Sequence, residues 1–295
     1  MAYKASDGVS QSILSNFLSC RMKGKLYLDG WRQDSPRRDA LDFGNLFHLK
    51  LEHHYSKSKA NTVQAWRDKC KSEGPINVED MEIIELQFET LWPFYQKAHA
   101  KADAKLSWGG RLEEVFDVQW NGHRLRGKID GIPMVGRKLW TFETKTKAQI
   151  DEDSMMLALE MDLQNMYYIT ALQTKGQRPV GVIYNIIRRP GLKYKLDDLP
   201  DYQRRLTEAV QKEPDHYFKR YEITYTDKQL KTFQDELKDA LAEYKLWTEG
   251  KLPTYKNTTA CVGRGQCQYL RLCSCAMSNT AGFNQDGVLF KELSA

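Results

Sequence analysis

The sequence has no long hydrophobic run, and this absence narrows the class of protein. Nowhere does it contain the stretch of about 18 consecutive apolar residues that a membrane-spanning helix requires. It opens Met-Ala-Tyr-Lys-Ala-Ser-Asp without an apolar signal stretch, so we expect neither secretion nor membrane association. It also lacks internal repeats and low-complexity linkers, and 41% of its residues are apolar and 28% charged. This composition predicts one soluble globular domain over residues 1–295.

A strong excess of one charge is also missing. The 44 Lys and Arg residues stand against 39 Asp and Glu residues, which leaves a net charge of +5. Such mild basicity does not by itself indicate a nucleic-acid partner. Any nucleic-acid function must therefore be argued from a local site.

Two carboxylates and a lysine lie on neighbouring strand-like segments. Asp130 ends an alternating run over 125–129, and Glu143-Thr144-Lys145 lies in another strand-like run 13 residues later. Side chains two apart on a strand share a face, so Lys145 is expected beside Glu143. Mg²⁺ and Mn²⁺ prefer carboxylate, carbonyl and water oxygens. The pattern is typical of metal-assisted phosphodiester hydrolysis, although such residues are also common in turns and as solvated surface pairs.

Helical patterns on both sides of these strands carry further polar residues. His48 ends the segment Gly44-Asn45-Leu46-Phe47-His48, inside a run whose apolar residues predict a mostly buried helix. Gln164 and Tyr168 lie four apart in a helical pattern over 157–172, so they share one helix face. Each of these residues alone is as readily a packing or surface residue. In chain order the combined set is His48, Asp130, Glu143, Lys145, Gln164 and Tyr168.

In this order the chain resembles the PD-(D/E)XK nuclease superfamily, specifically its RecB-like branch with Gly-x-x-x-His, Asp, Glu-x-Lys and Gln-x-x-x-Tyr signatures. The resemblance implies an α/β fold with a restriction-endonuclease-like core, in which helices flank a central mixed β-sheet. It also implies that Mg²⁺ or Mn²⁺ is held by His48, Asp130, Glu143 and the Thr144 carbonyl, with Lys145 as a catalytic residue. Ile129 stands before Asp130 where the superfamily's name places proline, and the RecB-like branch commonly has an apolar residue there.

The activity that the resemblance implies is DNA cleavage. RecB-like relatives usually process ends, which favours an exonuclease acting on single-stranded or duplex DNA ends in recombination, repair or phage DNA metabolism. The family's Gln and Tyr shape the active site and hold DNA, and they correspond to Gln164 and Tyr168. Arg126, Lys128 and Lys147 flank the site and are expected to bind DNA, because phosphates there need neutralising charge.

A different class of protein also fits this pattern. The chain can be a catalytically inactive DNA-end-binding or assembly module of a larger complex, with a helicase or recombination protein as its partner. An inactive module has no need of an intact His, Asp, Glu and Lys set, so the set favours the enzyme.

Glu113 or Glu114 is a further candidate for the active site, as a supporting carboxylate or a ligand of a second metal ion.

Four of the six cysteines lie within 15 residues: Cys261, Cys267, Cys273 and Cys275. Without a signal stretch we expect reduced thiols in the cytoplasm of a bacterium, an archaeon or a phage-infected cell, rather than disulfides. Clustered thiolates predict a soft-metal centre. Zinc sites typically use Cys-x₂₋₄-Cys spacing, whereas the two gaps between the first three of these cysteines each enclose five residues. Spacing alone leaves zinc and iron–sulfur both open.

The family resemblance bears on this choice. A subset of RecB-like nucleases, including the AddB nuclease domain and the CRISPR adaptation nucleases, holds a 4Fe-4S cluster through one N-terminal and three C-terminal cysteines. The segment 15–21 resembles the family's first-cysteine segment, which implies Cys20, Cys261, Cys267 and Cys273 as ligands that join the N- and C-terminal segments. Those relatives often have Cys-x₂-Cys where this chain has Cys261-x₅-Cys267. The second ligand, the choice between Cys273 and Cys275, and a structural Zn²⁺ ion therefore stay open.

Periodicity and turn signals predict helices first and a sheet second. Ser10 is expected to cap a helix that buries Ile13, Leu14, Phe17 and Leu18. Further helices are predicted over 39–56, 62–72, 78–103, 157–172, 200–213 and 227–248, and strands over 114–120, 124–129, 138–145, 180–187 and 221–224. We expect a helical part over 1–110 with the first cluster cysteine, a catalytic core over 111–190, helices and the other cysteines over 191–277, and a loosely held tail over 278–295.

Overall fold

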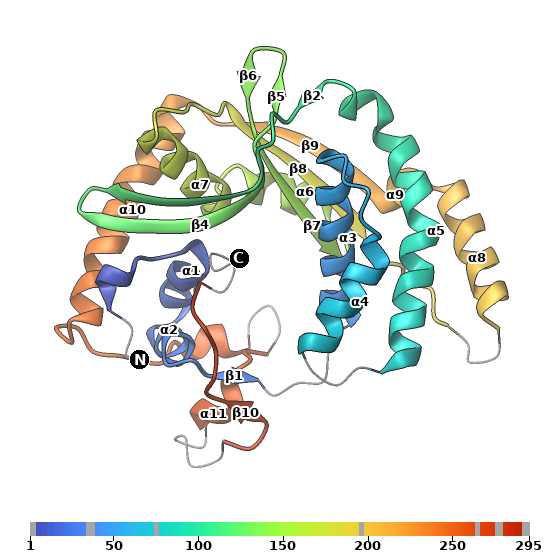
Figure 1. The fold of residues 1–295 in the computed structure, drawn as a ribbon. Helices are drawn as coiled ribbons and strands as arrows, with labels where there is room; N and C mark the ends of the chain where they lie inside the picture. The colour runs from blue at the N-terminus through green and yellow to red at the C-terminus, as the bar shows by residue number, and fades with distance from the viewer. Residues whose placement is uncertain are drawn as a thin grey trace.

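The computed structural model describes residues 4–33, 39–73, 77–194, 198–262, 266–274 and 280–290. The chain has a mixed α/β fold in which helices flank a central five-stranded sheet of order β3-β4-β7-β8-β9 (Figure 1). These strands are β3 (Leu112–Trp120), β4 (His123–Gly131), β7 (Thr141–Lys147), β8 (Gly181–Arg188) and β9 (Phe218–Thr224). Only β7 and β8 run parallel, and the other neighbours are antiparallel. The predicted central mixed sheet flanked by helices is confirmed.

Strands β3 and β4 form a hairpin, whereas β4 and β7 soon separate. The hairpin turns at Asn121-Gly122, whose φ angles of 46° and 77° fit the type I′ turn that the dipeptide predicts. Between β4 and β7 the described register contains a single pair, Gly131 opposite Phe142. The strands therefore diverge directly beside Asp130.

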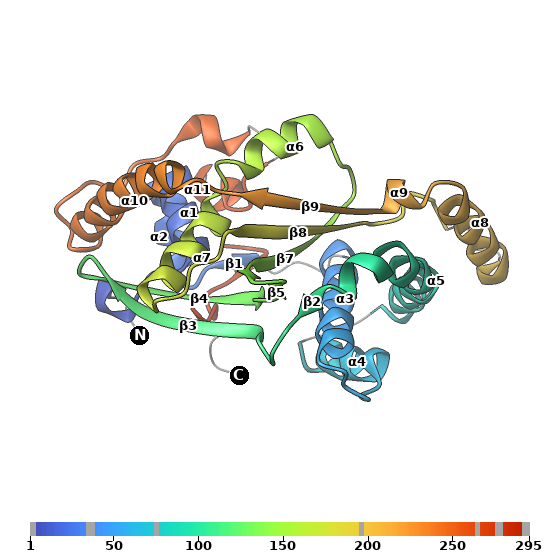
Figure 2. The ribbon, with the colours of Figure 1, turned by 90° about the horizontal axis from the view of Figure 1, so that it is seen from above.

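Both faces of the central sheet are covered by helices (Figure 2). On one face, Val182, Tyr184 and Ile186 of β8 join a core with α1 (Gln11–Ser19), α6 (Glu152–Leu159), α7 (Leu163–Thr174) and α10 (Asp227–Thr248). On the other face, Ile187 joins a core with α3 (Asp39–Tyr55), α4 (Thr62–Glu73), α5 (Val78–Asp103) and α8 (Leu199–Lys212). Alternate residues of β8 thus pack on opposite sides, as a doubly covered strand requires.

Several helices begin at residues whose side chains are typical N-caps. The Asn77 side chain accepts a hydrogen bond from the Glu79 N–H at the start of α5, and Thr226 and Gln229 form a capping box at the start of α10. Ser10 caps α1 as expected, but Leu18, which was expected to be buried, is 50% exposed. Leu41, in the predicted buried helix around His48, is likewise exposed.

The predicted single helix over 157–172 is wrong. Helix α6 ends at Leu159 and α7 begins at Leu163. Asp162 is the N-cap of α7, where its carboxylate accepts from the Asn165 N–H over 2.8 Å. The backbone of Asp162 is extended, with φ −69° and ψ 118°, as is usual for an N-cap residue. One helix therefore cannot run through it, and apolar periodicity does not register this break.

Two small sheets complete the fold. One joins β2 (Leu106–Ser107), β5 (Met134–Val135) and β6 (Lys138–Leu139), and the other joins β1 (Arg32–Gln33) to β10 (Phe283–Asn284). Residues 283–284, within the segment expected to be a loosely held tail, therefore pair with β1. The remaining short elements are α2 (Arg21–Leu28), α9 (Pro214–Tyr217), α11 (Leu270–Ser274) and the 3₁₀ turns η1 (Ala5–Asp7) and η2 (Thr258–Cys261). Among the helices in the described residues, none combines the length and hydropathy that a membrane-spanning helix requires.

Candidate active site and cysteine pocket

Asp130 lies at the point where β4 and β7 separate. Its Oδ2 atom accepts a hydrogen bond from the Thr144 N–H over 2.8 Å. Because β4 has diverged there, the carboxylate of Asp130 takes the place of a strand carbonyl as the partner of this N–H. The divergence therefore places one candidate carboxylate directly against the strand that carries the other.

Glu143 and Lys145 lie on the face of β7 that packs against α7. They stand in register with Tyr184 and Ile186 of β8, which belong to the core on that side of the sheet. The Lys145 ammonium donates to the Glu143 carboxylate, and also to Gln164 Oε1 over 3.0 Å. The predicted sharing of a face by Glu143 and Lys145 is confirmed.

Gln164 and Tyr168 extend this group from the first turns of α7. Gln164 Nε2 donates to Glu143 Oε1 over 2.9 Å and to the Tyr168 hydroxyl over 3.1 Å. The Tyr168 ring packs edge-on against Phe116 at 5.7 Å between centroids. Strand β7 and helix α7 therefore bring four of the predicted site residues into one hydrogen-bonded cluster.

His48 approaches the same region from α3. Its Nδ1 atom lies 3.5 Å from Asp130 Oδ2. One turn earlier, a Cβ atom added to Gly44 would lie 2.9 Å from the Thr146 hydroxyl of β7, closer than real Cβ contacts. The glycine therefore lets α3 approach the sheet closely enough for His48 to reach Asp130, which gives the Gly-x-x-x-His spacing a physical reason.

Burial dominates the electrostatics of these groups. Burial and the nearby Asp130 raise the pKa of Glu143 to about 7, and burial raises the pKa of Asp130 to about 6 against the Thr144 hydrogen bond, which lowers it. Burial lowers the pKa of His48, although Glu143 opposes the change. Burial also disfavours the charged Lys145, but Glu143 and Asp130 raise its pKa by more, so the net shift is upward. Near neutral pH the site combines a cationic lysine, a neutral imidazole and two carboxyl groups that ionise reluctantly.

The donor set suits a hard divalent cation. Glu143 Oε2 is buried and makes no hydrogen bond within the described residues, so one carboxylate oxygen is available. A nearby cation would favour the ionised form of both carboxyl groups, whose pKa values are raised. Among the described residues, however, no three His, Cys, Asp or Glu side chains already surround a single point as ligands of one ion. The side chains are adjacent, and holding an ion requires them to converge further.

The predicted DNA-binding lysines and the two candidate supporting carboxylates differ in how close they lie to this cluster. Lys128 pairs with Glu113 over 2.6 Å, and Glu113 contributes to the raised pKa of Asp130. Glu114 instead pairs with Arg111 over 2.8 Å. Lys147 is half-buried two residues beyond Lys145 on β7. Of the two candidate supporting carboxylates, Glu113 is the one coupled to the site.

Arg126 is engaged elsewhere. It lies four residues from Asp130, about 13 Å along an extended strand. Its guanidinium donates to the Asp7 carbonyl over 3.2 Å, lies 3.3 Å from Asp117, and stacks 4.3 Å from the Phe290 ring centroid. These contacts join the hairpin to both terminal segments.

Asp162 belongs to this neighbourhood and was missed from the sequence. Burial raises the pKa of its carboxyl group, and its charge contributes to the raised pKa of Lys145. The sequence did indicate that Asp162 could cap a helix, because Asp is a preferred N-cap and this residue precedes an apolar helical run.

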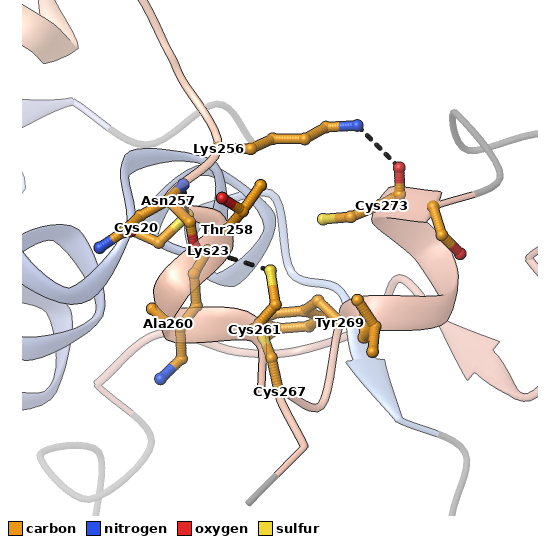
Figure 3. Close-up of a pocket in the computed structure, with 12 residues that line it drawn as sticks. Cys20, Lys23, Lys256, Asn257, Thr258, Ala260, Cys261, Cys267, Tyr269 and Cys273 are labelled. Carbon is orange, nitrogen blue, oxygen red and sulfur yellow. Dashed lines mark hydrogen bonds between the residues drawn. The ribbon is translucent and has the colours of Figure 1, made fainter. Parts of the chain in front are cut away.

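Four cysteines from the two ends of the chain line a pocket that contains none of the candidate active-site residues (Figure 3). Cys20 lies between α1 and α2, Cys261 ends η2, Cys267 precedes α11, and Cys273 lies in α11. The pocket has a volume of about 200 Å³. None of the five cysteines in the described residues forms a disulfide, and Cys275 lies outside those residues. The pocket thus brings together the four cysteines that the family resemblance implied as ligands.

Local hydrogen bonds hold the walls of this pocket. The Asn257 N–H donates to Cys20 Sγ over 3.2 Å, and its side-chain amide donates to the Ser19 carbonyl over 2.9 Å. Lys256 Nζ donates to the Cys273 carbonyl over 2.7 Å. Burial raises the pKa of the Cys273 thiol, with Lys256 opposing, and the other three cysteines raise it further. The thiols are therefore close enough to interact.

Comparisons with known proteins agree with this architecture. The family model described as PD-(D/E)XK nuclease superfamily matches residues 8–274. A crystal structure of a "Putative exonuclease" from Eubacterium rectale is similar in fold, with a TM-score of 0.53, 12% identity, and coverage of 98% of this chain and 94% of that chain. The crystal structure of SSO0001 covers 89% of this chain and 95% of its own at 15% identity, but its TM-score of 0.31 is too low to support an argument. No curated protein matches significantly.

The family match spans both sheet faces, the candidate active site and the cysteine pocket up to Ser274. On this basis the chain belongs to the PD-(D/E)XK nuclease superfamily.

Proposed function

We propose that this protein is a metal-dependent deoxyribonuclease of the RecB-like branch that degrades DNA from its ends. The observation that carries the proposal is the hydrogen-bonded Glu143, Lys145 and Gln164 cluster beside the His48 and Asp130 pair, in a member of a nuclease superfamily. The description of the similar Eubacterium rectale protein as a "Putative exonuclease" supports exonucleolytic rather than endonucleolytic action.

In the proposed mechanism, His48, Asp130, Glu143 and the Thr144 carbonyl would hold Mg²⁺ or Mn²⁺. When bound, such an ion would polarise the scissile phosphate and make a water more acidic. Lys145 would orient the attacking water in line with the leaving group and offset the negative charge that develops on the phosphate. The bond from Lys145 to Gln164 restricts where the ammonium can point.

The remaining polar residues would guide the DNA. Tyr168 positions Gln164 through their hydrogen bond. Lys147 and Lys128 lie beside Lys145 and Asp130 along their strands and would neutralise flanking phosphates. Arg126 would exchange its contacts with Asp117 and Phe290 for phosphates further along the DNA.

A cleavage assay tests the proposal. Labelled single-stranded and duplex DNA are incubated with Mn²⁺ and either wild type, Asp130→Ala, Lys145→Ala or the control Lys231→Ala. Lys231 pairs with Asp235 on the exposed face of α10. We expect shortening from the ends by wild type and the control only. DNA binding without cleavage in every sample, unchanged by the substitutions, would instead identify an inactive end-binding or assembly module.

We also propose that Cys20, Cys261, Cys267 and Cys273 hold a 4Fe-4S cluster with a structural role. Soft thiolates fit iron–sulfur and zinc alike. The four thiols line one pocket. The resemblance of the segment around Cys20 to iron–sulfur RecB-like nucleases favours the cluster, and one structural Zn²⁺ ion is the alternative.

Metal analysis of anaerobically purified protein distinguishes these ligands. We expect four iron atoms per chain with broad visible absorbance, and loss of both in Cys267→Ala. Cys70→Ala is the matched control, because Cys70 is buried in the α3, α4 and α5 core. A colourless protein that contains one zinc atom per chain would contradict the cluster.

A further inference from the structure

A row of polar side chains crosses the sheet on the face opposite α7. Thr144, Asn185 and Arg220 stand in register on β7, β8 and β9. Asn185 Nδ2 donates to the Thr144 hydroxyl over 3.3 Å, and Arg220 Nε donates to Asn185 Oδ1 over 3.2 Å. Thr144 is 1% exposed and Asn185 is fully buried. The row therefore runs through the interior, where apolar residues are the usual occupants.

Arg220 anchors the outer end of this row. It forms an ion pair with Asp103, and the two side chains are only 8% and 13% exposed. Its Nη2 atom donates to the Tyr95 hydroxyl over 2.7 Å and to the Tyr55 hydroxyl over 3.2 Å. Tyr95 in turn donates to Asn185 Oδ1 over 3.2 Å. Helices α3 and α5 and strand β9 thus fix the guanidinium from several sides.

The inner end of the row reaches the candidate active site. Thr144 lies between Glu143 and Lys145 in sequence, and its N–H is the group that Asp130 accepts from. Its backbone is therefore fixed by Asp130 while its side chain is fixed by Asn185. A shift of Thr144 would move Glu143 and Lys145 relative to Asp130.

Stability alone does not account for such a network. Burying a guanidinium and a carboxylate costs desolvation free energy, and apolar replacements of similar volume are often equally stable. A fully bonded polar network, by contrast, specifies one arrangement of its members. The position of this network, whose Thr144 lies between Glu143 and Lys145, makes that arrangement relevant to the site.

We propose that Asn185 and Arg220 are positioning residues that act through Thr144 to set the geometry of Asp130, Glu143 and Lys145. This inference rests on the proposed nuclease function and adds residues that contact neither the metal ion nor DNA. It also assigns a role to the Thr144 hydroxyl, separate from that of its carbonyl.

The test compares Mn²⁺ binding and turnover in variants of the row. The variants are Asn185→Leu, Thr144→Val, Thr144→Ser, and Arg220→Met combined with Asp103→Asn so that no unpaired carboxylate stays buried. Groups that orient metal ligands typically contribute about 10- to 100-fold to metal affinity. We expect the Mn²⁺ dissociation constant to rise by about that factor and kcat to fall, with the KM for DNA little changed. Thr144→Ser keeps the hydroxyl and should restore both values.

A second arginine–carboxylate ion pair provides the control for general destabilisation. Arg67 pairs with Glu85 between α4 and α5, outside the row, with the two side chains 43% and 9% exposed. Arg67→Met combined with Glu85→Gln should lower the melting temperature while leaving the Mn²⁺ dissociation constant at the wild-type value. All measurements are made well below the melting temperature of each variant.

Two results would overturn the inference. One is that folded Asn185→Leu and the folded Arg220 variant keep the Mn²⁺ affinity and kcat of wild type. The other is that the Arg67 control loses as much Mn²⁺ affinity as these variants do. Should the larger substitutions prevent folding, the comparison of Thr144→Val with Thr144→Ser decides, since equal behaviour of these two also refutes it. Failure of wild type itself to bind Mn²⁺ or cleave DNA would instead remove the proposed function.

Discussion

Replacing Asp130 with asparagine should stabilise the metal-free protein and destabilise it relative to wild type when Mn²⁺ is present. Burial raises the pKa of Asp130 from 3.8 to about 6. An acid whose pKa is raised on folding makes the folded state bind its proton more tightly than the unfolded state does. Stability is therefore lost as the pH rises above about 4, and the loss is complete above about pH 6.

The magnitude follows from the pKa shift. A change of about two units at about 1.4 kcal/mol each corresponds to about 3 kcal/mol as an upper limit. The Asp130 side chain is 22% exposed, so water reduces the effect, and about 1–2 kcal/mol is a reasonable expectation. Asparagine keeps the oxygen that accepts the Thr144 N–H, so the substitution removes the charge and retains the hydrogen bond.

Urea denaturation at pH 4 and pH 8, with EDTA or with Mn²⁺, measures this effect. With EDTA, Asp130→Asn should be more stable than wild type at pH 8 and equal to it at pH 4. With Mn²⁺ at about 100 times its dissociation constant, the free energy of unfolding of wild type rises by about 2.7 kcal/mol. The variant lacks one ligand of the ion, so its free energy of unfolding should then be lower than that of wild type. Lower stability of the variant in EDTA at pH 8 would refute the reasoning.

Asp117 supplies a control of opposite sign. The hydrogen bond from Arg124 lowers its pKa, so its ionised form stabilises the fold above about pH 4 and this contribution is lost as the pH falls. Asp117→Asn should therefore lower stability at pH 8, with no dependence on Mn²⁺.

Three further outcomes are expected. Lys145→Met should reduce kcat by about 100- to 10,000-fold while Mn²⁺ binding, followed by calorimetry, persists; near-wild-type turnover would exclude Lys145 from the chemistry. Gly44→Ala should weaken Mn²⁺ binding, because the added Cβ collides with β7. The control Gly191→Ala, where a Cβ meets open space, should leave Mn²⁺ binding unchanged. Equal effects of the two substitutions would argue against a close approach of α3 to β7 at Gly44. Mn²⁺ affinity should fall about 100-fold from pH 7.5 to pH 5.5, because protons compete for Glu143 and Asp130 with pKa values of about 7 and about 6; a flat profile would contradict these pKa values.

Features set by neighbouring residues were predictable from the sequence. The Asn77 cap, the Asn121-Gly122 turn and the shared face of Glu143 and Lys145 depend on a few adjacent residues whose geometry is nearly fixed. The contact between Gln164 and Glu143 could not be predicted from local sequence, because spacing alone does not say which helix face packs against which strand. The family resemblance supplied that link, and the hydrogen bond between the two side chains agrees with it.

Contacts between distant segments were not predictable in this way. Arg220 and Asp103 are 117 residues apart, and no periodicity marks them as partners. Asn185 did carry a signal, since it interrupts the apolar run of β8, but a polar residue in a buried strand indicates only that some partner exists. The pairing of β1 with β10 involves strands too short to register as a pattern.

The pairing of β1 with β10 and the shared cysteine pocket constrain when the enzyme can become complete during translation. Residues 20 and 32–33 leave the ribosome early, whereas their partners at 261–273 and 283–284 leave after the whole catalytic core has been made. Closing a loop of this length is slow and comes late in folding. A nascent chain interrupted before residue 261 would carry every proposed catalytic side chain and still lack the closure that holds its two ends together.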